Sequence, residues 1–334
     1  MKPARLRWGI LSTAYIGRAA VTPAIAASRN GVLIAVASRD AERARAYAVE
    51  AGIPAHYGSY GALLEDPGID AVYIPLPNSM HMEWTIRAAE HGKHVLCEKP
   101  LALTAAECHE MGAAADANGV RLMEAFMYRF HPRTERVLEL LRASAIGRPC
   151  AVRSTFSFRI TRPDNIRLKP ELGGGALMDV GCYCVNISRT VAGAEPIEAR
   201  AVARWAASGV DEQLAGTLRF ADGLVAQFDC ALTLERRERY EITGAGGHLV
   251  VESAFLPGTG DVVIREDHGR TAAVEHTIEG ADEYRLMVEH FADCVLVVAP
   301  PRHDAREAAG NMRAIEALYE SARRGGAPVA LSAG

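Results

Sequence analysis

Short apolar runs alternate with amphipathic helical stretches along the first third of the chain. Apolar runs of strand length occur at 6–11, 31–38, 69–77, 93–100 and 120–127. The stretches between them carry helix signals: Gly52 closes one, and Thr104 with Glu107 forms a capping box that opens another. We also expect a helix to begin at Thr22 as N-cap, with Pro23 at the first helical position. Repeated strand–helix units predict a doubly wound parallel sheet with ligands beyond the carboxyl ends of its strands.

The pattern changes after Cys150 to alternating or β-rich runs joined by short turns. These runs occupy 151–160, 197–206, 213–220, 224–233, 239–244, 248–253 and 261–266. Helices are expected at 132–145, 176–192, 283–298 and 304–324. Asp222–Gly223 and Gly244–Gly247 are hairpin signals, so this region predicts an open, mainly antiparallel sheet. We therefore expect an α/β protein with a Rossmann-type dinucleotide-binding domain at 1–125 and an α+β domain at 126–334.

Composition narrows the class of protein. The chain is 49% hydrophobic and 23% charged, as in globular proteins, and its 334 residues suggest two domains. Its net charge of −4 does not indicate binding to nucleic acid. No run reaches the roughly 18 apolar residues that a membrane span needs. The seven cysteines show no CxxC pair and no zinc spacing, so we expect no metal site. Their odd number and scatter suit a reducing compartment, and we expect a cytoplasmic protein.

The stretch GILSTAYIG at 9–17 has two interpretations. The basic start MKPARLR and the small residues Ala24, Ala26 and Ala27 are typical of a signal peptide. Polar interruptions and the early Arg18 argue against that interpretation. The stretch also follows the first predicted strand, where a dinucleotide turn would lie.

The usual G-x-G-x-x-G pattern falls in register as Ser12-x-Ala14-x-x-Gly17, so Ser and Ala replace two glycines. Small residues still let backbone N–H groups approach a pyrophosphate, and the Ser12 and Thr13 hydroxyls add possible hydrogen bonds. A plain tight turn between strand and helix is the alternative. The cofactor-binding candidates of this stretch are Gly9, Ser12, Thr13, Ala14, Tyr15 and Ile16.

The end of the second predicted strand favours NADP over NAD. An NAD-binding chain places an acidic residue there for the ribose hydroxyls, but this sequence has Ser38-Arg39. Ser and Arg accept a 2′-phosphate, which a carboxylate would repel. The neighbouring Asp40 counts against this interpretation, and a solvated helix start with an incidental arginine is the alternative.

Four stretches in order resemble the Gfo/Idh/MocA oxidoreductase family. They are GILSTAYIG (9–17), YIPLPNSMH (73–81), HVLCEKP (94–100) and GGGALMDVGCYCVN (173–186). The likeness covers essentially the whole chain. It is greatest to the branch that holds dimeric dihydrodiol dehydrogenase and the NADP-dependent D-xylose dehydrogenases, because Tyr183 stands where many members have His.

The resemblance implies roles for individual residues. Lys99 would lie beside the nicotinamide and polarise the substrate oxygen, while Tyr183 would handle the substrate proton and Asp179 would orient the reacting groups. Asp179 and Tyr183 are spaced i, i+4, which puts them on one helix face. The alternative for Tyr183 is a packing role. Further cofactor-binding candidates are Leu76, Pro77, Asn78, His81, Glu98 and Arg129, with Asn78 also a candidate N-cap; Phe156, Phe158 and Tyr284 are substrate-site candidates.

The implied activity is hydride transfer between NADP, or NAD, and an alcohol or carbonyl of a sugar-like or polyol-like substrate. An NAD-dependent glycosidase that oxidises its substrate transiently, a biosynthetic keto-sugar reductase and a non-catalytic nucleotide-binding sensor are the alternatives. In this family the open sheet often carries an oligomer interface, so we expect a homodimer or a higher homo-oligomer.

Overall fold

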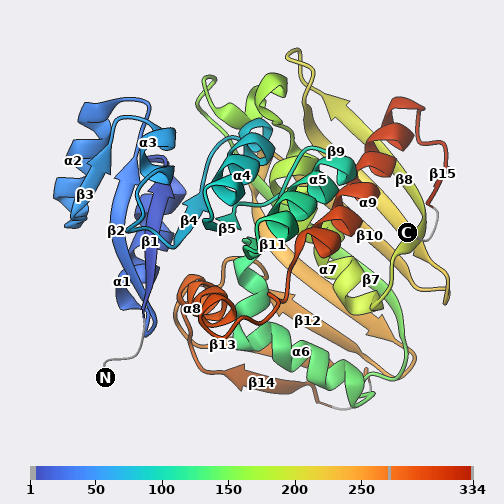
Figure 1. Cartoon of the computed structure of the whole chain (residues 1–334). Helices are drawn as coiled ribbons and strands as arrows, with labels where there is room; N and C mark the ends of the chain where they lie inside the picture. The colour runs from blue at the N-terminus through green and yellow to red at the C-terminus, as the bar shows by residue number, and fades with distance from the viewer. Residues whose placement is uncertain (1–4, 270–271, 332–334) are drawn as a thin grey trace. The chain divides into compact units, whose positions relative to one another are not determined.

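The computed structural model describes residues 5–269 and 272–331, which divide into two compact units (Figure 1). Unit 1 holds Met1–Phe130 and Asp282–Ala309, and unit 2 holds His131–Ala281 and Gly310–Gly334. The division thus gives a C-terminal segment to the first unit, unlike the single boundary expected after residue 125. Its helix α8 (Glu283–Leu296) packs there through Phe291, whose ring lies 5.3 Å from that of Trp8.

Unit 1 contains a six-stranded parallel sheet in the order β3-β2-β1-β4-β5-β6. Its strands are β1 (Leu6–Leu11), β2 (Gly31–Ala37), β3 (Ala55–Tyr57), β4 (Ala71–Ile74), β5 (His94–Cys97) and β6 (Leu122–Glu124). The apolar runs became the central strands because both faces of a parallel sheet are covered by helices. The short β3 and the helix α3 (Tyr60–Leu64) were not anticipated, because so few residues show no periodicity.

Local signals set several helix ends of unit 1. Its other helices are α1 (Thr22–Ala27), α2 (Ala41–Ala51), α4 (His81–Glu90) and α5 (Ala105–Ala117). Gly52 closes α2 in the left-handed conformation, and Thr104 Oγ1 accepts from the Glu107 amide as predicted. The predicted N-cap at Thr22 is wrong: a π-helical turn at Gly17–Val21 runs directly into α1, and the Thr22 hydroxyl contacts Tyr47 Oη at 2.5 Å instead.

The described residues of unit 2 contain a nine-stranded mixed sheet in the order β14-β13-β12-β11-β7-β10-β9-β8-β15, in which β7 and β10 pair in parallel and the other neighbours pair antiparallel. Its strands are β7 (Pro149–Arg159), β8 (Pro196–Trp205), β9 (Asp211–Phe220), β10 (Val225–Ala231), β11 (Thr233–Gly244), β12 (His248–Glu252), β13 (Val262–Asp267), β14 (Val274–Ile278) and β15 (Val329–Ala330). Sequence patterning missed β14 and β15.

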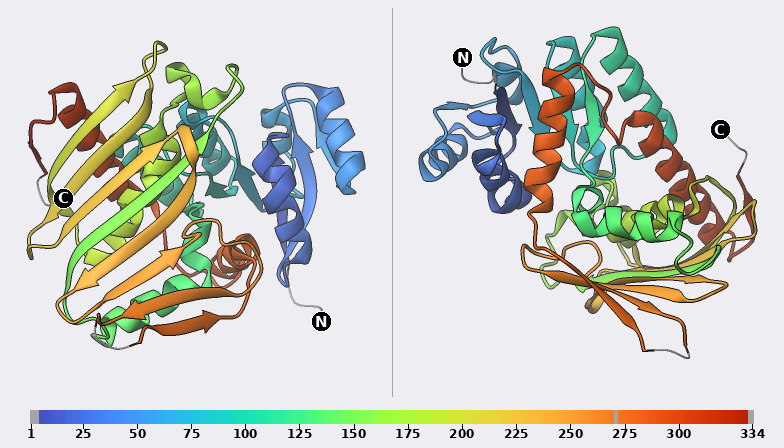
Figure 2. Two further views of the ribbon diagram at one scale, coloured as in Figure 1. Left: turned by 180° about the vertical axis from the view of Figure 1, so that it is seen from behind. Right: turned by 90° about the horizontal axis from the view of Figure 1, so that it is seen from below.

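Helices α6 (Pro132–Arg142), α7 (Cys182–Ala192) and α9 (Ala305–Arg323) lie on one face of this sheet (Figure 2). Alternation along the strands explains the arrangement, because Leu249 and Val251 of β12 are fully buried while His248, Val250 and Glu252 turn to the opposite face. In the view from behind, no helix of the described chain covers that opposite face, which we call the open face. The helix predicted at 176–192 exists, but its first turn, Leu177–Gly181, is π-helical.

Candidate functional site

The turn after β1 has the small-residue geometry of a phosphate loop. Ser12 adopts a positive φ of 142°, and its Oγ accepts from the Ala14 amide at 2.9 Å. Helical backbone begins at the next residue, Tyr15, whose side chain is 82% exposed. Ser12 and Thr13 are half-buried. Ser12 therefore shapes the turn with its own hydroxyl, and the helix start that follows has first-turn amides without partners inside the helix, which is what an anion site requires.

Gly9 has a packing role that differs from the cofactor contact expected for it. It lies within β1, and a Cβ atom there would approach Leu63 Cδ2 to 2.8 Å. A larger residue would require the Leu63 side chain to move, because α3 packs directly on the strand.

Two residues of opposite charge, Arg39 and Asp40, follow β2, and their side chains have different partners. The Asp40 carboxylate turns back onto its own helix, where Oδ1 accepts from the amides of Glu42 (3.0 Å) and Arg43 (3.1 Å). Asp40 is therefore the N-cap of α2, and its Oδ1 oxygen accepts hydrogen bonds from the first turn of its own helix. Arg39 is exposed and its charge opposes the rise in the Tyr60 pKa that burial causes, while Ser38 is buried with Oγ accepting from the Asp40 amide.

The expected ribose contact of His81 is corrected by the structure. The imidazole is fully buried, and its nitrogens lie 3.0 Å from the Pro100 carbonyl and 2.9 Å from the Leu76 carbonyl. Burial lowers the pKa of His81, so the ring is neutral and donates to only one of the two. His81 thus holds the backbone that carries Leu76 and does not reach a ligand itself.

Asn78 is also not a side-chain N-cap. It opens a single 3-10 turn, Asn78–Met80, whose N-cap position is taken by the half-buried Pro77. Helix α4 follows directly, with Met80 at its N-cap and no side-chain cap bond. The backbone at Pro77 and the Asn78 side chain remain predicted contacts of the ribose.

Glu98 and Lys99 follow β5 at the carboxyl edge of the parallel sheet. Glu98 Oε1 accepts from the Tyr73 hydroxyl at 2.5 Å, and Oε2 accepts from the Lys99 amide at 3.3 Å. Burial and the Glu98 charge raise the pKa of Tyr73 well above its usual range, so this tyrosine stays protonated and donates. Lys99 is half-buried and joined to Pro100 by a cis peptide bond.

Arg129 and Tyr284 both belong to unit 1. Arg129 forms an ion pair with Glu307 at 3.2 Å, and both side chains are mostly buried. Tyr284 lies in the first turn of α8 and is half-buried. This ion pair engages the Arg129 guanidinium within unit 1, and the nicotinamide contact stays a prediction.

In unit 2, the segment running from the π-helical turn into α7 carries Asp179 and Tyr183. The Asp179 carboxylate accepts from Arg167 Nε at 2.6 Å, and only 13% of its side chain is exposed. Arg167 comes from the connection between β7 and this helix, and its guanidinium also lies 5.7 Å from the centre of the Phe158 ring. A close partner of opposite charge fixes the orientation of the carboxylate.

Tyr183 is held by an aromatic cluster. Its ring lies 5.4 Å from Phe156 and 5.2 Å from Phe255, and the two phenylalanines stack 5.3 Å apart. Phe156 and Tyr183 are each 4% exposed. Phe156 therefore supports the tyrosine ring, a role that sequence did not indicate. Sequence reasoning missed two further residues at the start of this segment: Asp211, which accepts from the Leu177 amide, and Tyr319, which donates to Asp211.

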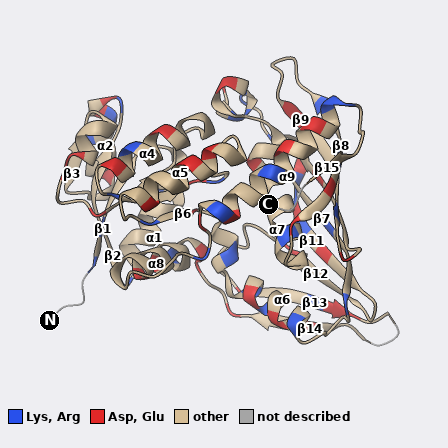
Figure 3. Ribbon diagram, turned by 45° about the vertical axis from the view of Figure 1, so that its right-hand side comes forward, with Lys and Arg blue, Asp and Glu red and all other residues tan. Residues whose placement is uncertain are grey.

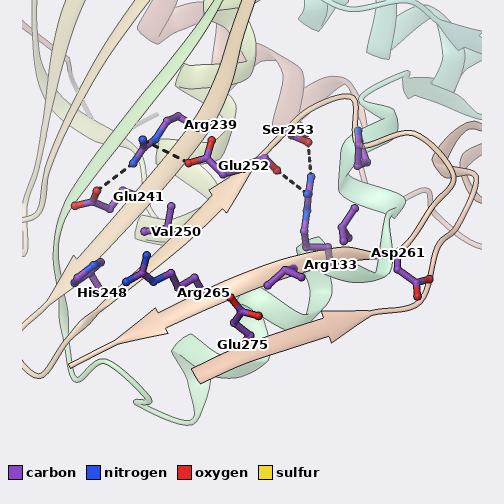
Figure 4. Close-up of a pocket in the computed structure, with 13 residues that line it drawn as sticks. Arg133, Arg239, Glu241, His248, Val250, Glu252, Ser253, Asp261, Arg265 and Glu275 are labelled. Atoms are coloured by element: carbon purple, nitrogen blue, oxygen red, sulfur yellow. Dashed lines mark hydrogen bonds and ion pairs between the residues drawn. The ribbon is translucent and has the colours of Figure 1, made fainter. Parts of the chain in front are cut away.

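A groove of about 680 Å³ lies elsewhere in unit 2, on the open face across β11, β12 and β13 (Figure 4). Arg239, Glu241, His248, Arg265 and Glu275 line it with both signs of charge. Arg239 is paired with Glu252 at 3.4 Å and Glu241 at 3.6 Å. None of the residues predicted to bind cofactor or substrate contributes to its lining, so this groove belongs to the open face and not to the predicted site.

Three general features complete the description. Among residues 5–269 and 272–331 no cluster of His, Cys, Asp and Glu has metal-binding geometry. No helix in the described part is long and apolar enough to cross a membrane. The seven cysteines all lie in the described part of the chain and form no disulfide there; Cys150 is exposed and the other six are buried.

The residues of unit 1 fit a dinucleotide with a 2′-phosphate. A turn of small residues leads into a helix start, and the strand beside it ends on an exposed arginine whose acidic neighbour is engaged in a helix cap. These are the donor types that a pyrophosphate and a phosphomonoester require.

Comparison with known proteins agrees with this geometry. Residues 6–126 match the model of an oxidoreductase family with an NAD-binding Rossmann fold, and residues 134–250 match the GFO/IDH/MocA C-terminal domain. A D-xylose 1-dehydrogenase (NADP(+)) from Haloferax volcanii is 43% identical over 96% of this chain and 99% of its own. A trans-1,2-dihydrobenzene-1,2-diol dehydrogenase from Xenopus tropicalis is 32% identical over 87% of this chain and 89% of its own.

Two solved structures also resemble this chain over nearly its whole length. The aldose–aldose oxidoreductase from Caulobacter crescentus, crystallised with glycerol, superimposes with a TM-score of 0.91 at 29% identity, over 98% of this chain and all of that one. A 3-ketoreductase from Actinomadura kijaniata, in complex with NADP and TDP-benzene, gives 0.90 at 29% identity, over 95% of this chain and 98% of that one. The resemblance seen in the sequence is confirmed, and the chain belongs to the GFO/IDH/MocA family of oxidoreductases.

Proposed function

We propose that this protein is an NADP-dependent oxidoreductase that interconverts an alcohol and a carbonyl group on a sugar-like or polyol-like substrate. The nicotinamide supplies the hydride acceptor or donor. Its relatives support the substrate class, since they include an NADP-dependent D-xylose dehydrogenase and a structure that holds glycerol. The sequence does not select the direction, because the same residues serve oxidation and reduction.

The observation that carries the proposal is the placement of Asp179 and Tyr183 on one helical segment, with Asp179 charge-paired to Arg167 at 2.6 Å. Oxidation of an alcohol requires removal of the hydroxyl proton, and we assign that proton to the Tyr183 oxygen. Asp179 orients the substrate hydroxyl. Lys99 stabilises negative charge on the substrate oxygen as the proton leaves.

The preference for NADP rests on Arg39 and Asp40. An acidic residue that bound the ribose hydroxyls would need its carboxylate oxygens, but Asp40 Oδ1 already accepts two amides of α2. Arg39 remains exposed at the end of β2 and offers a guanidinium to the 2′-phosphate.

The experiment that tests the proposal is a titration of the purified protein with NADPH and with NADH, followed by nicotinamide fluorescence. We expect preferential binding of NADPH and, in a screen of aldoses with NADP, formation of NADPH. Failure of both nucleotides to bind a preparation that has retained none would overturn the function. Release of sugar from a glycoside without net NADPH formation would instead identify the glycosidase.

We further propose that the open face of unit 2 forms a homodimer in the reducing environment of the cytoplasm. Basic and acidic residues alternate along the strands of this sheet (Figure 3), and Arg239 is flanked by Glu241 and Glu252. A two-fold axis places such a surface against its own complement. Light scattering after size exclusion should give twice the chain mass at micromolar concentration, and a monomer would contradict this assembly.

A further inference from the structure

We propose that Asp211 is a positioning residue for the proposed site: its buried carboxylate anchors the start of the helix that carries Asp179 and Tyr183. The inference rests on the function proposed above for those two side chains. Asp211 begins β9, is 1% exposed and lies 34 residues beyond the helix start that it contacts.

Two hydrogen bonds define the anchor. Asp211 Oδ2 accepts from the amide of Leu177, the first residue of the π-helical turn, at 2.7 Å. Asp211 Oδ1 accepts from the hydroxyl of Tyr319 in α9, also at 2.7 Å. The first amides of a helix have no partner within the helix, and a negative charge there opposes the helix dipole favourably. A strand and a distant helix thus supply a cap that the local sequence lacks.

Gly175 shows how tightly the helix start is fitted to the anchor. Its φ is +125°, and a Cβ atom would lie 2.2 Å from Asp211 Oδ1 and 2.8 Å from the Tyr319 hydroxyl. The carbonyl of Gly175 accepts from the Asp179 amide at 3.0 Å. The backbone that sets the position of Asp179 therefore packs against the Asp211 carboxylate at Gly175 and donates a hydrogen bond to it from Leu177.

The anchor is sensitive to protonation. Burial raises the pKa of Asp211 to about 6, against the lowering by its hydrogen bonds from Tyr319 and Leu177. The groups that face it are Tyr319 on α9, whose ring lies under Arg323 at 5.4 Å, Cys230 on β10 and the amides of the helix start. Protonation replaces an acceptor of two donors by a group that must itself donate, so the cap weakens as the pH falls below about 6.

This chemistry predicts an acidic limb in the pH profile that comes from a group outside the reacting atoms. Asp211→Asn imitates the protonated state, since an amide accepts through one atom only. We expect its kcat to fall about 10-fold or more at pH 7.5, because small displacements of reacting groups are costly, with NADPH affinity unchanged. The variant should also lack the limb near pH 6 that we expect for the wild type.

A second variant and a matched control separate positioning from general damage. Tyr319→Phe removes one of the two donors and should shift the limb and lower kcat less than Asp211→Asn does. Tyr57→Phe is the control, because Tyr57 donates to Asp66 Oδ2 at 2.7 Å in unit 1 and should change neither kcat nor the limb.

Hydrogen–deuterium exchange provides a readout that needs no turnover. Amides between 176 and 181 should exchange about 10-fold faster in Asp211→Asn, and in the wild type below pH 6 after correction for intrinsic rates, whereas Tyr57→Phe should match the wild type. Identical pH profiles and identical exchange in wild type and Asp211→Asn would overturn the inference. If Asp211→Asn does not fold, Tyr319→Phe decides by the same criteria. Lack of any turnover by a wild type that shows the exchange effect would refute the proposed function and leave the anchor standing.

Discussion

The two units hold their predicted functional groups in different ways. In unit 1 the groups lie at the ends of neighbouring strands, and short-range bonds shape them: Ser12 holds the Ala14 amide, and Asp40 holds the start of its own helix. In unit 2 Asp179 and Tyr183 lie on one helical segment that is fixed by partners from other elements, Arg167 and Asp211. A local motif is therefore enough to predict the functional groups of unit 1. The orientation of the groups in unit 2 depends on charged side chains from other elements of the chain.

Two buried tyrosine–carboxylate pairs illustrate the contrast. Tyr73 donates to Glu98, which directly precedes Lys99 in the motif, and Tyr319 donates to Asp211, which no motif indicated. Burial raises the pKa of both tyrosines well above its usual range, so each acts as a donor. The same pair of groups serves a strand end in one unit and a helix start in the other. Substitutions in the two units should therefore affect kcat, the free energy of unfolding and NADPH affinity to different extents.

The largest effect is expected from Tyr183→Phe in unit 2. Loss of the hydroxyl should lower kcat by about 10²-fold or more, the usual contribution of a general acid–base, with NADPH affinity nearly unchanged. The ring contacts with Phe156 and Phe255 persist in phenylalanine, so the fold should be kept. Steady-state kinetics and fluorescence titration measure the two quantities.

Tyr240→Phe is the matched control, because Tyr240 is a buried member of the same aromatic region, 6.3 Å from Phe255. Its kcat should equal that of the wild type. Near-normal turnover by Tyr183→Phe would remove the assigned proton transfer and leave Tyr183 as a packing residue.

A smaller effect, on stability, is expected from His81→Leu in unit 1. Removing the imidazole takes away the ring N–H that one of the buried carbonyls of Leu76 and Pro100 accepts, which should lower the free energy of unfolding by about 1–3 kcal/mol. Urea denaturation measures the loss. The ratio of NADPH to NADH affinity should not change. Unchanged stability together with weaker nucleotide binding would restore the direct contact that sequence suggested.

The smallest effect is expected from Arg39→Ala. The dissociation constant for NADPH should rise about 10-fold, equivalent to about 1.4 kcal/mol, because one exposed charged hydrogen-bond donor is lost. NADH affinity should stay nearly constant. Arg45→Ala, which removes an exposed arginine paired with Glu42 in the same helix, is the control. Equal losses for both nucleotides would show that Arg39 does not read the 2′-phosphate.

The sequence determined most of the secondary structure and the outline of both half-sites. Strand and helix periodicity located the central strands of unit 1, Gly52 and Thr104 set helix ends, and the helix predicted at 176–192 is the segment that carries Asp179 and Tyr183. These features succeed because they depend on neighbours within about one helical turn or one strand, which are visible in a single stretch of chain.

Only the tertiary structure decided which polar groups are satisfied and by what. It turned His81 inward, engaged Asp40 in a cap, paired Arg167 with Asp179 and brought Asp211 and Tyr319, 108 residues apart, to one helix start. A buried donor or acceptor must find a partner wherever packing places one, and packing joins residues without regard to their separation in the chain. For this reason the residues proposed to react could be predicted from sequence motifs. The residues that hold them in place were found only in the tertiary structure.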